Sequence, residues 1–404
     1  MAEPGKVETS VETNQFAAIS IGNDEANRLR LDIRPDFEID LSSGWRGDLS
    51  LRLESAHAMV GLGSLQTYDE ASHPLELGDS TRIEIDQATL SWRKRSTRVT
   101  LGKQTLAWGV LDGLQVTDRF DAVRRREAVF IDQRPDRMSR WGARAQFKHA
   151  GTRWDIAGVL DGTADQFAIP GDTYAVRAPR YRAGLPAAAS LPDLHVKLSD
   201  EPTLGVKASR RFGANDASFL IIHGPDTEPV FRASTTGVAL EYDSRTLVGA
   251  TWQRSSGPRV WRLEAASISD QPVNLQSATP TTDDRQRWLV GLGVDWDLPD
   301  GLFANAQLGV DHITGPDLVR PSTDVVATLK LQKTLSNDTL RLGAELLASL
   351  NEGDGTFRPS ISWRATDKVR LDAGLDLVWG EADGIFGQYA ETDRVWIKTT
   401  FSLS

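Results

Sequence analysis

The chain has 404 residues and a formal net charge of −10 at pH 7. Cysteine is absent, which excludes disulfide frameworks, cysteine-based zinc sites and thiol nucleophiles. The acidic balance argues against nucleic acid as a partner, because neutralising phosphates requires a basic face. No apolar run approaches the roughly 18 residues of a membrane-spanning helix, and no linker divides the chain, so we expect one β-rich domain over residues 1–404. Its first residues lack the basic and apolar regions of a secretion signal, so any such signal was removed or never present.

The first clear element alternates over Asn27 to Leu41, with apolar residues such as Leu31 and Ile33 at odd positions and charged ones such as Arg30 at even positions. A period of two predicts a β-strand. The pattern lasts about fifteen residues, whereas soluble strands usually stop at five or six. Such a length is typical of a tilted strand that crosses a bilayer. We expect Val11 to Ile21 to supply a strand before it.

The same alternation recurs further along the chain, at Arg140 to Lys148, Trp288 to Leu298, Thr339 to Leu350, Lys368 to Trp379 and Arg394 to Leu403. In a soluble sandwich the apolar face of each strand would form the core. In a membrane barrel that face contacts lipid, and the charged face lines water. The connections between the strands separate these two interpretations, because outer-membrane barrels alternate short periplasmic turns with longer outside loops.

Short and long connections do alternate in this sequence. The short turns are predicted at Ser42 to Arg46, Lys94 to Ser96, His149 to Gly151, Gly213 to Asn215, Ser255 to Pro258, Pro299 to Asp300, Leu335 to Asp338 and Thr366 to Asp367. The outside loops are predicted near Gly61 to Ser80, Gly109 to Met138, Asp161 to Pro202, Gly224 to Ser234, Asp270 to Asp284, Gly315 to Pro321, Asn351 to Gly355 and Glu381 to Ala390.

The predicted fold is therefore all-β, a single transmembrane antiparallel up-and-down β-barrel of about 18 strands. This count treats Thr235 to Arg254 as one long strand, although Tyr242 to Arg245 could form a turn. Sixteen strands is the alternative count.

One segment resembles a known family. Leu101 to Asp118 reads LGKQTLAWGVLDGLQVTD, which is similar to the "LGRQ…WG…D…V.D" segment of proteobacterial barrels often encoded beside RND-type exporters. With the strand and loop pattern, the chain resembles the outer-membrane porin and porin-like channel superfamily, including alginate-export-like barrels. The resemblance implies a bacterial outer-membrane location, contact with lipid and lipopolysaccharide, and a channel for a small polar or amphipathic solute, without cofactor or metal. The alternative is an exit component for an inner-membrane RND-type exporter; whether the barrel is a monomer or a trimer is left open.

In porins the loop after the fifth strand folds into the lumen, so the resemblance implies that residues 109–138 form the pore constriction. Its charged candidates are Asp112, Asp118, Arg119, Asp121, Arg124, Arg125, Arg126, Asp132 and Arg134. Opposed acids and bases would set a transverse field for a polar solute. The Arg124 to Arg126 triplet is predicted to attract anions, with two alternatives: a solvated surface run, or neutralisation by neighbouring aspartates.

Further lumen residues are predicted from the polar phase of the strands: Arg140, Arg144, Lys148, Arg153, Lys207 and Arg211. For each of them, a salt bridge across the wall is the alternative to a solute contact. Residues 161–202 are expected to form a long outside loop, either a mobile connection or a lid or partner surface.

A catalytic site is not expected. The histidines are His57, His73, His149, His195, His223 and His312. Asp311 and His312 form the one suggestive pair, but neighbouring strand residues point to opposite faces. No Gly-x-Ser-x-Gly, His-Glu-x-x-His, EF-hand or P-loop pattern is present, and Gly291-Leu-Gly293 lies within an alternating strand. We expect a channel that passes an anionic solute and is not an enzyme; an outer-membrane barrel hydrolase is the alternative from another class.

Overall fold

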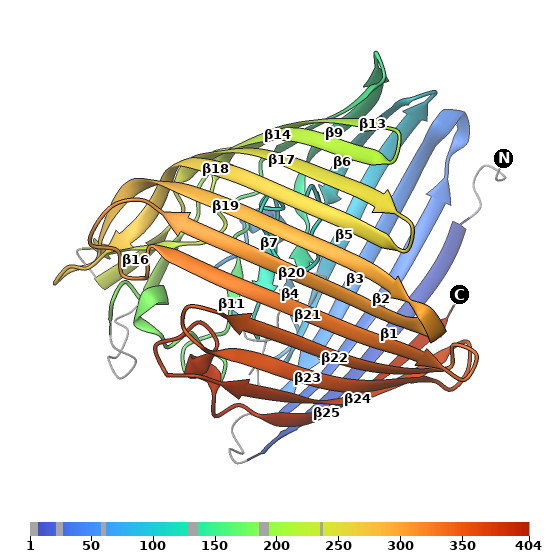
Figure 1. The fold of residues 1–404 in the computed structure, drawn as a ribbon. Coiled ribbons are helices and arrows are strands. Elements are labelled where there is room, and N and C mark those ends of the chain that lie inside the picture. The colour runs from blue at the N-terminus through green and yellow to red at the C-terminus, as the bar shows by residue number, and fades with distance from the viewer. Residues whose placement is uncertain are drawn as a thin grey trace.

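The computed structural model describes residues 7–21, 27–57, 62–127, 136–185, 194–234 and 237–403. Within these ranges eighteen long strands form one antiparallel sheet, and its last strand pairs back with its first, which closes the barrel (Figure 1). The wall strands are β1 (Val7–Ser20), β2 (Arg28–Asp40), β3 (Trp45–Ala56), β5 (Thr81–Lys94), β6 (Thr97–Gln104), β9 (Arg140–His149), β10 (Thr152–Val159), β13 (Thr203–Phe212), β14 (Asn215–Pro225), β17 (Ser244–Ser256), β18 (Arg259–Leu275), β19 (Thr281–Leu298), β20 (Leu302–Ile313), β21 (Thr323–Leu335), β22 (Leu340–Ser349), β23 (Gly355–Arg364), β24 (Val369–Trp379) and β25 (Arg394–Leu403). The predicted all-β up-and-down barrel is confirmed, with eighteen strands and not sixteen.

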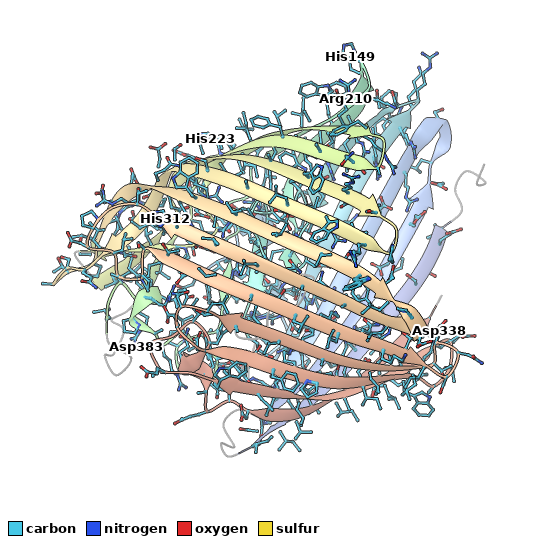
Figure 2. All side chains as sticks on the ribbon, in the orientation of Figure 1. His149, Arg210, His223, His312, Asp338 and Asp383 are labelled. Carbon is cyan, nitrogen blue, oxygen red and sulfur yellow. The ribbon has the colours of Figure 1, made fainter. Side chains whose placement is uncertain are left out.

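The predicted short turns all lie at one end of the barrel, where β1 begins and β25 ends (Figure 1). Tight turns between antiparallel strands need residues with positive φ, and Arg95 (φ 54°), Gly257 (φ 56°) and Asp300 (φ 60°) supply it. We call this the turn end and the opposite one the loop end. In Figure 2, His149, Arg210 and Asp338 mark the turn end.

Apolar and charged side chains are distributed in the reverse of the soluble pattern. On β19, Trp288, Leu292 and Trp296 point outward, and Leu292 is 46% exposed. Arg287, on the opposite phase, is only 6% exposed inside the barrel. An apolar outer band with aromatic residues near both of its edges is the surface of a membrane-embedded barrel. Within the described residues, no helix has the length and apolar character to span a membrane.

Two predicted boundaries are wrong. Residues 237–254 are not one strand: β16 (Gly237–Glu241) ends before Tyr242, and the wall strand β17 starts at Ser244. After Tyr242 the chain joins the wall: the carbonyl of Asp243 accepts a hydrogen bond from the Asp226 amide (2.9 Å), directly beyond the last β14–β17 pair, Pro225 and Ser244. The count of eighteen survives because β16 belongs to the connection, not to the wall. Residues 270–284 are also mostly strand, since β18 and β19 stay paired beyond a bulge near Ile268.

The remaining elements are short. β16 pairs with β12 (Leu194–Lys197) and β15 (Val230–Ser234) in a small sheet at the loop end. A second small sheet joins β7 (Ala122–Arg125), β8 (Arg137–Met138) and β11 (Gln166–Phe167), and β4 (Leu75–Glu76) extends the edge of β5. The single-turn 3-10 helices are η2 (Ser42–Gly44), η4 (Glu70–Ser72), η5 (Pro179–Tyr181), η6 (Pro299–Gly301) and η7 (Gly387–Tyr389). Both small sheets are built by long connections, two of which enter the barrel interior.

Candidate pore interior

The connection between β6 and β9 crosses the inside of the barrel. Its described residues are 105–127 and 136–139, which we call the interior loop. Near its start, the carbonyl of Asp112 accepts a hydrogen bond from Gln307 of β20 (2.5 Å). Further on, Glu127 binds Arg30 of β2 (2.5 Å) and Arg394 of β25 (2.9 Å). Because β20 and β2 belong to separate parts of the barrel wall, the interior loop bridges them.

A single buried carboxylate anchors the first half of the interior loop. Glu264 of β18 is 0% exposed and accepts hydrogen bonds from the backbone amides of Val110, Leu111 (2.8 Å) and Thr117 (2.8 Å). The Thr117 hydroxyl donates a further bond (2.6 Å). Ionised acceptors make the stronger class of hydrogen bonds, and a carboxylate buried in a barrel wall requires such partners. Glu264 therefore fixes the loop against the wall.

An apolar patch on the inner face of the wall is the second attachment of the interior loop. We call Glu264 and this patch together the loop seat. Leu220, Ile222, Leu247, Ile268 and Leu289 are buried there with the loop residues Leu106, Trp108, Val116 and Phe120. Trp108 and Phe120 meet edge to face, with ring centroids 5.1 Å apart. Wall glycines allow the close approach: a Cβ on Gly205 would lie 2.7 Å from Trp108, and one on Gly293 would lie 2.8 Å from Leu111. On these strands both phases are apolar, one toward lipid and one toward the loop.

The arginine triplet is paired with acids. Arg124 binds Glu84 (2.5 Å) and Asp136 (3.0 Å). Arg125 binds Asp165 (2.5 Å) and lies 3.6 Å from Glu228, and Arg126 binds Glu54 (2.9 Å). Most of these acids come from wall strands and from other loops, not from the neighbouring aspartates that the sequence suggested. Each guanidinium of the triplet thus faces an opposite charge.

The other predicted loop residues have separate partners. Asp118 binds Arg137 and accepts the Trp108 amide (3.0 Å). Asp121 accepts the Leu106 amide. Arg119 lies 3.6 Å from Glu228, Asp112 lies 3.5 Å from Arg262, and Asp132 and Arg134 fall outside the described residues.

The six predicted wall residues divide by depth. Arg140 is 3% exposed and donates to the carbonyl of Phe120, and Arg144 binds Asp155 (2.5 Å). Lys207 donates to the carbonyl of Trp108 (2.6 Å) and supports the interior loop. Lys148 and Arg153 are exposed near the turn end, as is Arg211, which lies 3.8 Å from Asp216.

The connection between β10 and β13 also enters the barrel. It joins the two strands at the loop end, and its residues 161–185 turn back into the mouth. Asp172 binds Arg28 of β2 (2.5 Å), and Arg180 binds Glu352 of the β22–β23 connection (2.5 Å). Tyr174, 1% exposed, accepts a hydrogen bond from Arg394 (3.2 Å). These contacts hold this loop across the loop-end mouth. Ala187 to Ala189, Pro186 and Pro192 lie outside the described residues.

Arginines and aromatic rings gather where the two interior connections meet the wall. The guanidinium of Arg394 lies 5.2 Å from the ring centroid of Phe16 and 5.5 Å from that of Tyr174. The Phe16 ring in turn lies 6.2 Å from that of Trp396. Glu127 enters this cluster from the interior loop. Burial opposes its charge, but the guanidiniums of Arg394 and Arg30 hold the pKa of Glu127 well below its usual range.

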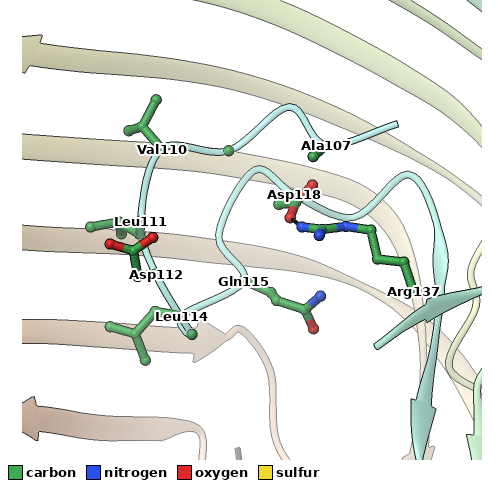
Figure 3. A pocket seen from close by; sticks show the side chains of 10 residues that line it. Ala107, Val110, Leu111, Asp112, Leu114, Gln115, Asp118 and Arg137 are labelled. Atoms are coloured by element: carbon green, nitrogen blue, oxygen red, sulfur yellow. Dashed lines mark hydrogen bonds and ion pairs between the residues drawn. The ribbon is translucent and has the colours of Figure 1, made fainter. Parts of the chain in front are cut away.

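A cavity of about 180 Å³ lies beside the interior loop, lined by residues 109–115 together with Ala107, Asp118 and Arg137. Figure 3 shows the loop curling around it, with the Asp118 and Arg137 ion pair at one side. A water molecule occupies about 30 Å³ in the liquid, so the cavity has room for a few waters. It is polar on one side and apolar on the side of Leu111 and Leu114.

The histidines do not form a catalytic arrangement. Asp311 binds Arg287 (2.8 Å) inside the barrel, whereas His312 contacts the Thr323 hydroxyl (2.8 Å) on the outer phase. His223 contacts the Thr246 hydroxyl (2.9 Å), and in Figure 2 both His223 and His312 lie toward the loop end. Among the described residues, no group of three or more His, Asp or Glu side chains could hold a metal ion.

The anchoring residues were missed by sequence reasoning. Glu264 is a single acid on the polar phase of a strand, which alternation alone gives no reason to select. The apolar seat did leave a signal: Phe219 to Ile222 is an unbroken apolar run, typical of a strand covered on both faces. Such a run within a barrel wall indicates that something packs against its inner side.

Comparisons with known proteins agree with this geometry. No family model and no curated protein sequence matches the chain. Among solved structures, OccAB4 of Acinetobacter baumannii aligns over 99% of both chains with a TM-score of 0.57 and 8% identity. A BenF-like porin from Pseudomonas fluorescens Pf-5 has a TM-score of 0.56 and 9% identity, covering 99% of this chain and 98% of its own. OccK8 (OprE) of Pseudomonas aeruginosa has a TM-score of 0.54 and 8% identity over 98% of each chain. At such identities the likeness shows the fold, which is porin-like.

Proposed function

We propose that this porin-like barrel is an outer-membrane channel that passes a small polar or amphipathic solute, preferably an anion, through its charged lumen. The observation that carries this proposal is the reversed distribution of side chains: a closed barrel with an apolar outer band and an interior of ionised residues. Such a wall separates lipid from water. A closed barrel also leaves no unpaired sheet edge in the membrane.

The interior loop is the proposed constriction. It bridges separate parts of the wall at mid-depth, where Glu264 and the apolar patch hold it. The ion pairs of Glu127 with Arg30 and Arg394 hold the far end of the interior loop against the wall in the same way. Charged groups at a narrow point select solutes by charge and by hydrogen bonding.

The channel function is tested by reconstituting the purified barrel in planar lipid bilayers. We expect discrete conductance steps in KCl. Absence of conductance from barrel that migrates as a folded, heat-modifiable band would overturn the proposal.

The constriction is tested in the same bilayers with Glu264→Ala. This change leaves the loop amides of Leu111 and Thr117 without their acceptor and costs about 1 to 3 kcal/mol. We expect a larger single-channel conductance with more frequent fluctuations, because the loop is no longer held. Asp297→Asn, which removes an exposed acid on the lumen phase of β19 that does not touch the loop, serves as control and is expected to leave the conductance nearly unchanged. An unaltered Glu264→Ala conductance would show that the loop does not limit the pore.

A further inference from the structure

Five exposed cations lie side by side on the lumen phase of one part of the wall at the turn end. They lie on consecutive wall strands, from β5 to β13, and all five are exposed: Arg93, Arg98, Lys148, Arg153 and Arg211. We call them the turn-end basic arc. Their phase is set by the strand pairing, since Arg93 and Arg98 lie on the same face as the buried Ser91 and Thr100. The arc therefore faces water inside the pore, not lipid.

The register places like charges directly opposite each other. Arg93 pairs with Arg98 across β5 and β6, and Lys148 pairs with Arg153 across β9 and β10. Like charges directly opposite on neighbouring strands are destabilising. The repulsion between these cations destabilises two adjacent strand pairs, β5–β6 and β9–β10. A bound anion that relieves this repulsion explains why the cations lie there.

Acids compensate this charge at one of the five positions. Arg211 lies 3.8 Å from Asp216, but no carboxylate of the described residues lies within 4.0 Å of the other four cations. Asp155, two residues from Arg153, binds Arg144 instead (2.5 Å). Deeper in the barrel the pattern differs, as with the guanidinium of Arg52, which binds Asp32 (2.7 Å). Four of the five cations of the arc thus form a concentration of unpaired positive charge at the turn-end mouth.

We propose that the turn-end basic arc binds a small linear polyanion, with the chemistry of a short chain of phosphates, and gives the channel its anion preference. The proposal rests on the channel function proposed above. A polyvalent ligand is favoured because neighbouring strands are about 4.8 Å apart, so one extended anion can bridge both repulsive pairs. Guanidiniums bind phosphate oxygens through paired N–H donors. A lipid headgroup does not fit, because the arc lies on the lumen phase.

The test uses inorganic tripolyphosphate as the probe, added to one side of a bilayer that holds a single channel. We expect block at a lower concentration from one side than from the other, because the arc lies at one mouth. The variant Arg93→Gln/Arg98→Gln/Lys148→Gln/Arg153→Gln is expected to raise the half-blocking concentration at least ten-fold. Its reversal potential in a KCl gradient should also move toward that of a cation-selective pore.

A matched control removes the same charge from the outer phase of the same end: Lys94→Gln/Arg210→Gln/Arg254→Gln/Arg259→Gln. We expect this control to keep the block and the selectivity of the original barrel. If the fourfold lumen variant does not fold, the pairs Arg93→Gln/Arg98→Gln and Lys148→Gln/Arg153→Gln are measured separately. A conducting lumen variant with unchanged block and selectivity would overturn the inference and leave the channel function intact. Equal loss of block in the outer-phase control would also overturn it.

Discussion

The residue with the most distinctive environment in the interior loop is Asp121. It is 4% exposed; one of its carboxylate oxygens accepts the Leu106 amide, and within the described residues the other has no hydrogen-bond partner. Burial raises the pKa of Asp121 to about 6, although the guanidinium of Arg140 acts in the opposite direction. A carboxylic acid with a raised pKa binds its proton more tightly in the folded state than in the unfolded one.

The free energy of unfolding therefore depends on pH through Asp121. An unfolded aspartate has a pKa of about 4, so stability from protonated Asp121 is fully present below pH 4 and is lost as the pH rises through 6. Asp121→Asn resembles the protonated form at every pH. We expect the variant to be more stable than the original barrel by about 3 kcal/mol at pH 7.5 and nearly equal to it near pH 4. The unfolding midpoint in urea at both pH values measures this.

The control is Asp112→Asn, a more exposed position in the same loop, where we expect little change at either pH. A stability difference between Asp121→Asn and the original barrel that is independent of pH would contradict the assignment of the titration to Asp121.

At the scale of elements, the interior loop and the wall are matched in shape. Leu111 approaches Gly291 and Gly293 so closely that a Cβ on either glycine would collide with its side chain. Glycine at these lumen-facing positions is therefore required by packing and not by backbone conformation. The Gly-Leu-Gly sequence is thus part of the loop seat, and sequence inspection alone gave it no role.

Gly291→Ala/Gly293→Ala is expected to displace the tip of the interior loop. Overpacking of this kind costs about 1 to 3 kcal/mol, and it should lower the unfolding midpoint and increase current noise in bilayers. Adding Leu111→Ala removes the colliding side chain, so we expect the triple variant to recover most of the lost stability. A double variant as stable and as quiet as the original barrel would show that the loop does not pack on these strands.

At the scale of the whole molecule, apolar side chains lie on the outer face of the barrel and charged ones on the inner face. A new charge is therefore expected to destabilise the protein more on the outer face than on the inner face. Leu292 lies midway between the outward Trp288 and Trp296 of β19. Leu292→Arg places a charge near the centre of the lipid band, which costs about 2 to 4 kcal/mol in a bilayer. Gln332→Arg, on the lumen phase of β21, is expected to cost less than about 1 kcal/mol, because its side chain faces water. Denaturant unfolding in phospholipid vesicles compares the two. Equal costs would contradict the assignment of the faces.

The barrel fold could be predicted from the sequence alone, because the alternation of apolar and charged residues and the residues of tight turns are local features of the chain. Period two in segments such as Asn27 to Leu41 fixes which side chains face lipid, because the side-chain period of a strand is two. Short turns with residues such as Asp300 fix the antiparallel order. Together they define the strand number, the two ends and the lumen phase of Arg144 and Lys207. The sequence did not reveal that β16 and β17 are separate strands near Tyr242, because a strand in a loop and a strand in the wall have the same local pattern.

The charge partners and the seat of the interior loop were decided only by the tertiary structure. Arg126 binds Glu54, 72 residues away, and Val110 binds Glu264, 154 residues away. Each guanidinium could pair with any acid of the lumen phase, and the sequence contains many. The choice depends on how the barrel closes and where the loop crosses it. Closure brings distant strands to one interior, and only that geometry neutralises the arginine triplet while leaving four cations of the turn-end basic arc without an acidic partner.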